Sequence, residues 1–331
     1  MPDGFIVTLI KSLILANLVM GVFALLTWAE RRLLGRFQVR LGPNRVGPFG
    51  LLQPIADLVK LIRKESLMPV GVNPVLYLAA PVVSLFASLA VFAVIPFGGR
   101  AEIPGTSFHF HLWVSDPSVA LLVVFALGSL SFYGFLVGGW SSSSKYSLYG
   151  SMRAVSQLIS YEVSLALAVI GVVMMSHTLS LTGIVAAQHH DGLWYIFPQF
   201  LGFAVYVVAS TAEVSRIPFD LPEAESELVA GYHTEYGGMR FAMYQNAEYV
   251  ALIAFSAIAS ILFLGGYSGP FLPGPVWMLL KMSVFILGAM WVRATLPRVR
   301  YDALMSIGWK VLLPLATLNL LVTSVIVAWR A

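Results

Sequence analysis

The residues best suited to chemistry are carboxylates that lie within or at the ends of otherwise apolar stretches. Glu162, Glu213 and Glu248 each lie in a stretch long enough to cross a bilayer, and Glu30 follows the first such stretch. A charge inside a membrane is costly and usually marks an ion or proton pathway. Counted from the predicted helix starts, Glu162 and Glu248 lie about two turns from the inner end, roughly 10–12 Å. This spacing predicts a hydrated half-channel that admits protons from the inner side.

The same carboxylates have an alternative, structural interpretation. Each can form a buried ion pair with Arg153, Arg216 or Arg293, and such pairs fix helix packing without moving protons. The sequence leaves both interpretations open.

A second acidic group lies in the connection 214–240, between Arg216 and Arg240. A run of like charge is usually a solvated face. Here, however, apolar residues such as Phe219 and Leu228 interrupt the run, which indicates a packed loop with partly desolvated carboxylates. Desolvation raises carboxyl pKa values towards the range of proton exchange. The carboxylates of this loop are Asp220, Glu223, Glu225, Glu227 and Glu235, and the predicted proton path comprises Glu162, Glu213, Asp220, Glu223, Glu225, Glu227 and Glu248.

A third group of polar residues follows the first apolar stretch. The segment 30–48 is rich in Arg, Gly and Pro, and its Gly-Pro pairs favour turns. The next segment, 51–65, has apolar residues at helical spacing with Asp57, Lys60 and Lys64 opposite, so we expect a short helix along the membrane interface. Composition alone favours a lipid-anchored loop. The functional alternative is a lateral doorway for a lipid-soluble substrate.

The elements that position these groups are predicted to be membrane helices. The 331 residues are 58% hydrophobic and 11% charged, against roughly 25% charged in soluble domains. The chain has no cysteine, which excludes disulfides, iron–sulfur clusters and thiolate metal sites within it. Its basic residues fall between apolar stretches instead of forming one soluble face, so they indicate membrane orientation and not nucleic-acid binding.

The sequence predicts an all-α integral membrane protein, a single transmembrane domain over 1–331 with short interfacial helices. The first stretch is too long for a signal peptide and lacks its basic start, so we expect a retained helix. Lys and Arg concentrate in the connections 30–75, 140–153, 214–240 and 298–306, which the positive-inside rule assigns to the inner face, with both termini outside. The eight predicted spans are 5–29, 76–97, 117–139, 154–175, 195–213, 241–264, 276–297 and 307–329.

The inner connections and adjoining helix ends carry a set of motifs: Glu30-Arg31-Arg32, Gly35-Arg36-Phe37-Gln38, Arg40, Gly42-Pro43-Asn44-Arg45, Gly47-Pro48, Leu52-Gln53-Pro54-Ile55-Ala56-Asp57, Ser151-Met152-Arg153-Ala154, Gln157, Ser160-Tyr161-Glu162-Val163, the segment 216–232, Glu235-Tyr236 and the segment 293–302. Together these motifs resemble the quinone-site membrane subunits of respiratory complex I, the proton-pumping NADH:quinone oxidoreductase. The resemblance covers nearly the whole chain in order. One departure is Val214-Ser215, where the family commonly carries Thr-Asn, which changes the hydrogen-bonding groups at that helix end.

The resemblance implies a polypeptide that forms the membrane part of a quinone channel and couples quinone reduction to proton translocation. Quinone is then a substrate, and this chain binds no cofactor, because FMN and iron–sulfur clusters belong to partner subunits. The implied partners are the redox subunits of the peripheral arm, which the inner connections face, other membrane-arm subunits and lipids. The implied location is an energy-transducing membrane such as the bacterial cytoplasmic (inner) membrane. The candidate channel residues are Arg36, Phe37, Gln38, Asp57, Lys60 and Arg63.

Two alternatives stay open from the sequence. The nearer is the homologous subunit of a membrane-bound hydrogenase or ferredoxin-linked complex, which shares several acidic motifs. The other is a stand-alone ion transporter, which the sequence disfavours because it has no repeated halves and no paired helix interruptions.

Overall fold

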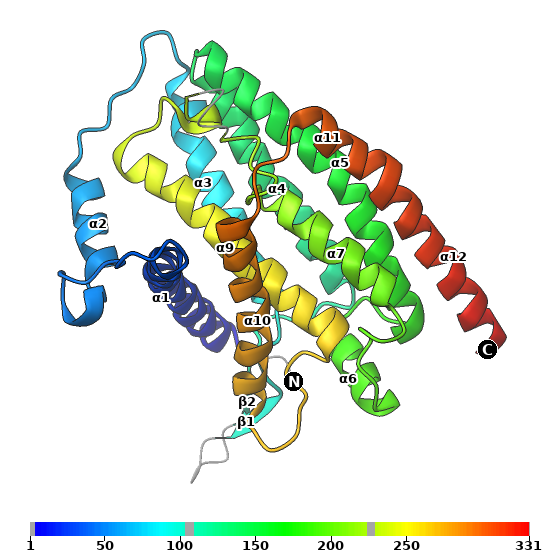
Figure 1. The fold of residues 1–331 in the computed structure, drawn as a ribbon. Coiled ribbons are helices and arrows are strands. Elements are labelled where there is room, and N and C mark those ends of the chain that lie inside the picture. Colours follow the sequence, from blue (N-terminus) through cyan, green and yellow to red (C-terminus); the bar gives the residue numbers. More distant parts are fainter. Residues whose placement is uncertain (1–3, 103–108, 224–228, 331) are drawn as a thin grey trace.

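The computed structural model describes residues 4–102, 109–223 and 229–330, and these form a bundle of long helices (Figure 1). Within the described residues, seven helices are long and apolar enough to cross a membrane, and a shorter apolar helix, α7, accompanies them. The expected all-α, multi-pass membrane fold is thereby confirmed. In chain order the helices are α1 (Phe5–Phe37), η1 (Pro48–Gly50), α2 (Gln53–Arg63), α3 (Pro74–Ala90), η2 (Val91–Val94), α4 (Ala120–Ser141), α5 (Lys145–Ser176), α6 (Leu181–Asp191), α7 (Phe200–Glu213), η3 (Gly231–His233), α9 (Gly238–Leu264), α10 (Gly274–Thr295), α11 (Tyr301–Ile307), η4 (Gly308–Leu312) and α12 (Leu313–Arg330).

Helix α9 lies at the centre of the bundle. Most of its residues are apolar, as expected of a helix surrounded by protein, and it is the most buried of the seven long helices. Figure 1 shows it running through the middle, with α1 and α2 to one side and α5 and α12 to the other. Helix α1, by contrast, is largely exposed and presents apolar side chains such as Leu9 and Leu13 outward, towards lipid. The core around α9 therefore positions the polar groups described below.

Helices α3 and α4 approach closely because a glycine lies between them. A Cβ on Gly134 of α4 would lie 2.0 Å from Ser84 Oγ and 2.7 Å from the Ala80 carbonyl oxygen of α3. Small residues at helix contacts let backbones approach in membranes, where packing contributes most of the association energy. Gly134 is thus required by the α3–α4 contact.

Several boundaries differ from the sequence expectation. Helix α5 begins at Lys145 and not near 154, because its polar first turns are helical although they are not apolar. Helix α7 begins at Phe200 and not at 195; its 14 residues extend about 21 Å, less than the roughly 30 Å of a hydrocarbon core. Helix α6 and the antiparallel pair β1 (Arg100–Glu102) and β2 (His109–His111) lie in connections between the predicted spans.

Both described ends of the chain lie toward the same end of the bundle. Figure 1 shows them on the side that carries α6 and the β1–β2 hairpin. The number of crossings and the side of the termini stay predictions, because α7 is a shorter apolar helix than the seven candidate spans of the described residues.

Candidate functional site: a buried series of carboxylates

Glu30 at the inner end of α1 forms the centre of a buried ion cluster. Arg293 of α10 donates a hydrogen bond to Glu30 Oε1, and Arg216 Nη1 lies 3.8 Å from the same oxygen. The Arg216 guanidinium also lies 3.9 Å from the centre of the Tyr249 ring on α9. The cluster joins α1, α9, α10 and the loop after α7. The structural interpretation of the membrane carboxylates is therefore confirmed for Glu30.

Asp220 lies in the loop after α7, next to this cluster. Its Oδ2 is 3.5 Å from Arg298 Nη2, and Arg298 also donates to the Asp220 backbone oxygen. Burial, reinforced by the nearby Glu223 carboxylate, raises the pKa of Asp220 to about 7 against the opposing effect of the surrounding arginines. A carboxyl group with this pKa exchanges protons at neutral pH.

Glu223 and Glu248 form the next step of the series. Gln245 Nε2 donates to Glu223 Oε1 at 3.1 Å, and the Tyr232 hydroxyl donates to Glu248 Oε1 at 2.6 Å. Glu223 is an electrostatic and hydrogen-bonding neighbour of Glu248, which is buried in α9. The structure thus brings these two predicted residues together, whereas Glu225 and Glu227 lie outside the described residues.

Glu213 and Glu162 form a second carboxylate pair. Glu213 ends α7 and is 2% exposed, and Glu162 on α5 is its electrostatic neighbour. Ser129 Oγ donates to Glu162 Oε1 at 2.6 Å, and Glu162 lines a groove of about 180 Å³ between α4 and α5. The expected depth of Glu162 is wrong, because α5 begins at Lys145 and Glu162 lies near its middle.

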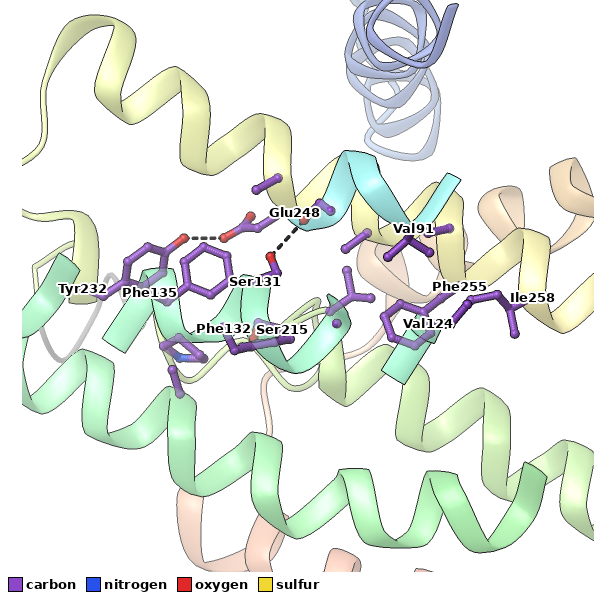
Figure 2. A pocket seen from close by; sticks show the side chains of 18 residues that line it. Val91, Val124, Ser131, Phe132, Phe135, Ser215, Tyr232, Glu248, Phe255 and Ile258 are labelled. Carbon is purple, nitrogen blue, oxygen red and sulfur yellow. Dashed lines mark hydrogen bonds between the residues drawn. The ribbon is translucent and has the colours of Figure 1, made fainter. Parts of the chain in front are cut away.

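A cavity of about 30 Å³ lies next to Glu248 in the core of the bundle. Figure 2 shows Glu248, Tyr232 and Ser131 around one part of it and Phe255 and Ile258 at the far end. Gly128 of α4 also lines the cavity, and a Cβ there would lie 3.7 Å from Glu213 Oε1. The cavity therefore reaches from the Glu248–Tyr232 pair to the neighbourhood of Glu213.

The candidate channel residues gather around the inner end of α1 and along α2. The predicted interfacial helix is confirmed as α2, and its apolar side chains, including Ile55 and Ile62, are exposed. Asp57 Oδ2 lies 2.5 Å from Arg31 Nη1, which ties α2 to α1. The remaining candidates all lie exposed on this surface: Arg36, Phe37, Gln38, Lys60 and Arg63.

Comparison with known proteins shows the family. A model of the family described as NADH dehydrogenase matches residues 10–324. This chain belongs to the NADH dehydrogenase family. It is 49% identical to an NADH-quinone oxidoreductase subunit of Syntrophobacter fumaroxidans, over 98% of this chain and 97% of the relative. It is 47% identical to the corresponding NADH-quinone oxidoreductase subunit of Thermomicrobium roseum over 98% and 97%, and 45% identical to that of Brevibacillus brevis over 97% and 94%.

Sequence reasoning missed several side chains that support the carboxylates in this NADH dehydrogenase family member. Tyr232 holds Glu248, and Gln157 Nε2 donates to the carbonyl oxygens of Ala212 and Phe219 at 2.5 and 2.8 Å, which fixes the start of the acidic loop on α5. Both lie in motifs that carry the family resemblance, but one-dimensional spacing does not reveal their partners.

The departure at Ser215 also has a structural explanation. Ser215 adopts a left-handed backbone with φ of 54° directly after α7. Asn, which the family commonly carries here, enters this region more readily than Ser. Ser215 is therefore a slightly strained substitute at a turn that the fold imposes.

Proposed function

We propose that this chain is the membrane subunit of a proton-translocating NADH:quinone oxidoreductase that admits quinone beside α1 and α2. The names of the three relatives support this assignment over a hydrogenase or ferredoxin-linked complex. The observation that carries the coupling role is the presence of two groups of neighbouring carboxylates in the bundle, Asp220–Glu223–Glu248 and Glu213–Glu162, in which Glu213 and Glu248 are buried and the others partly buried.

In the proposed mechanism, quinone reduction at the inner face consumes protons together with electrons. The negative charge that develops near the headgroup is stabilised by the cationic residues Arg36, Lys60 and Arg63. Asp220 takes up a proton near neutral pH because its pKa is raised to about 7. The proton then moves by way of Glu223 to Glu248, and past the cavity to Glu213.

Glu162 is the proposed end of the path within this chain. Its groove opens at the surface of the bundle between α4 and α5, where Tyr133 and Ile159 are exposed. A carboxylate facing lipid is costly, so a neighbouring membrane-arm subunit covers this groove in the assembled enzyme.

The proposed partners follow from what the chain lacks. It has no cysteine to hold an iron–sulfur cluster, so FMN and the clusters reside in the peripheral-arm subunits that dock on the inner connections. We place the enzyme in an energy-transducing membrane, the bacterial cytoplasmic membrane, with both termini of this chain on the outer side. A stand-alone transporter would need none of these partners.

The doorway is tested by substituting Arg36 or Arg63 with Ala. We expect lower quinone reductase activity, while electron transfer from NADH to a soluble artificial acceptor persists. Arg300→Ala is the matched control, because Arg300 is an exposed arginine that pairs with exposed Asp302 near the inner end of α11. Unchanged quinone kinetics in both variants, or equal loss of both activities, would contradict a doorway at α1 and α2.

A further inference from the structure

Two serine side chains from neighbouring helices meet at the wall of the central cavity. Ser88 Oγ of α3 lies 2.9 Å from Ser131 Oγ of α4, and both residues line the cavity. Each hydroxyl also lies within hydrogen-bonding distance of the Ser84 carbonyl oxygen, at 2.9 and 3.1 Å. Either hydroxyl can donate to the other. Since each has one proton and two lone pairs, the pair retains the capacity to bind a further partner in the cavity.

The cavity is large enough for water, and a few polar side chains in its mostly apolar wall can bind it. A volume of about 30 Å³ holds about two water molecules, and a buried water needs two to four polar partners. Most of the wall is apolar. The polar side chains that line the cavity are Ser88, Ser131, Ser215, Tyr232 and Glu248.

The position of the serine pair relates it to both carboxylate pairs. Figure 2 shows Ser131 beside the part of the cavity that holds Glu248 and Tyr232. Gly128 precedes Ser131 by one turn on the same face of α4. Because Gly128 has no side chain, Glu213 can lie close to the cavity wall at this position. A water bound at the serine pair therefore shares the cavity with Glu248 and lies within one helical turn of Gly128, which Glu213 approaches.

We propose that Ser88 and Ser131 are positioning residues that hold water in this cavity and so connect Glu248 to Glu213. This inference rests on the proposed function. A protonated Glu248 gives its proton to the bound water while that water gives one of its own protons towards Glu213. One O–H bond of the water breaks and another forms, so the water stays neutral. The serine hydroxyls then rotate between donating and accepting while the water returns to its starting orientation.

The test compares Ser131→Val with Ser131→Thr. Both substitutions add a methyl-sized group beside the cavity, but only Thr keeps the hydroxyl, so the pair separates hydrogen bonding from packing. We expect the Val variant to pump protons about tenfold more slowly, as for loss of a group that assists proton transfer, and the Thr variant to stay close to the parent. The readout is proton uptake by vesicles during NADH oxidation, with electron transfer to a soluble acceptor as the measure of assembly.

Ser84→Ala is the matched control. Ser84 is fully buried in the same serine group, and its hydroxyl donates to the Ser131 backbone oxygen, but it does not line the cavity. We expect it to pump like the parent. Equal pumping by the Val and Thr variants, whether normal or reduced, would overturn the role of the hydroxyl.

A further comparison separates this inference from the proposed function. If Glu248→Gln stops pumping while Ser131→Val and a Ser88→Ala, Ser131→Val double variant pump normally, the serine role alone is wrong. If Glu248→Gln also pumps normally, the proposed proton path itself is wrong.

Discussion

Glu30 and Asp220 belong to the same inner group of charges, yet their surroundings give them different roles. Glu30 faces two arginines, Arg216 and Arg293, and serves as their buried counter-charge. Asp220 is buried near another carboxylate, Glu223, and its pKa is raised to about 7. We therefore expect removal of Glu30 to cost stability, and removal of Asp220 to cost a protonation step in addition to its pair with Arg298.

Substituting Asp220 with Asn tests this protonation step. The ordinary pKa of this carboxyl is 3.8, and burial followed by the Glu223 charge raises it to about 7. Because the pKa in the folded protein is higher than the ordinary value, the protonated carboxyl group adds to the free energy of unfolding. This contribution is complete below about pH 4 and is lost as the pH rises through about 7. We expect parent pumping to decline as the pH rises through 7 and the Asn variant to lack that inflection. An unchanged inflection in the variant, measured on vesicles across this range, would assign it to another group.

Substituting Glu30 with Gln tests the ion cluster. The change leaves Arg216 and Arg293 without their counter-charge, and breaking a buried pair costs about 3–5 kcal/mol. We expect a lower melting temperature and a lower yield of the assembled enzyme. Asp302→Asn breaks an exposed pair with Arg300, so it should change neither property. Equal stability of the two variants would show that the Glu30 cluster does not hold the helices together.

Among the helices, the α3–α4 contact places a strict demand on the sequence. A Cβ on Gly134 would meet Ser84 Oγ and the Ala80 carbonyl oxygen at distances that real contacts do not show. Gly134→Ala should therefore separate the two helices and destabilise the protein by about 1–3 kcal/mol. Gly288→Ala on α10 is the control, because nothing lies within 4 Å of its added Cβ. Thermal unfolding of the two purified variants makes the comparison, and equal melting temperatures would contradict the close contact.

The positions of the helices show how far the sequence can predict the fold. The length of the apolar stretches located all the long helices among the described residues, because a helix that crosses a hydrocarbon core needs about 20 apolar residues. The same criterion also located the shorter helix α7. It misplaced the start of α5, where Lys145–Arg153 is helical but polar, and consequently the depth of Glu162. The contact of Glu30 with Arg293 joins residues far apart in the chain, so no local spacing predicts it. The channel residues stay a prediction, although α2 itself is confirmed.

The molecule as a whole combines a lipid-facing exterior with a buried acidic series that runs from the inner loops into the bundle. The orientation of the chain in the membrane is directly testable, because the chain has no cysteine and a single introduced cysteine is its only thiol. The positive-inside rule predicts that Lys145 lies on the inner face and His190 on the outer face. Single cysteines at these exposed positions should react with an impermeant maleimide from opposite sides of the membrane. Labelling of both from one side, detected as a mass shift of this chain, would contradict the predicted topology.

The most direct test of the account is the ratio of protons pumped to electrons transferred in Glu213→Gln and Glu248→Gln, measured with assembly on the same preparation. Gln keeps the size and much of the hydrogen bonding of Glu but has no proton to exchange, whereas Asp keeps the acid on a shorter side chain. Glu248 lines the central cavity, and Glu213 lies close to Gly128 in the cavity wall, so we predict that Gln lowers the ratio strongly at one or both positions and that Asp retains part of it. Fully assembled Gln variants that pump at the parent ratio would contradict the proton path.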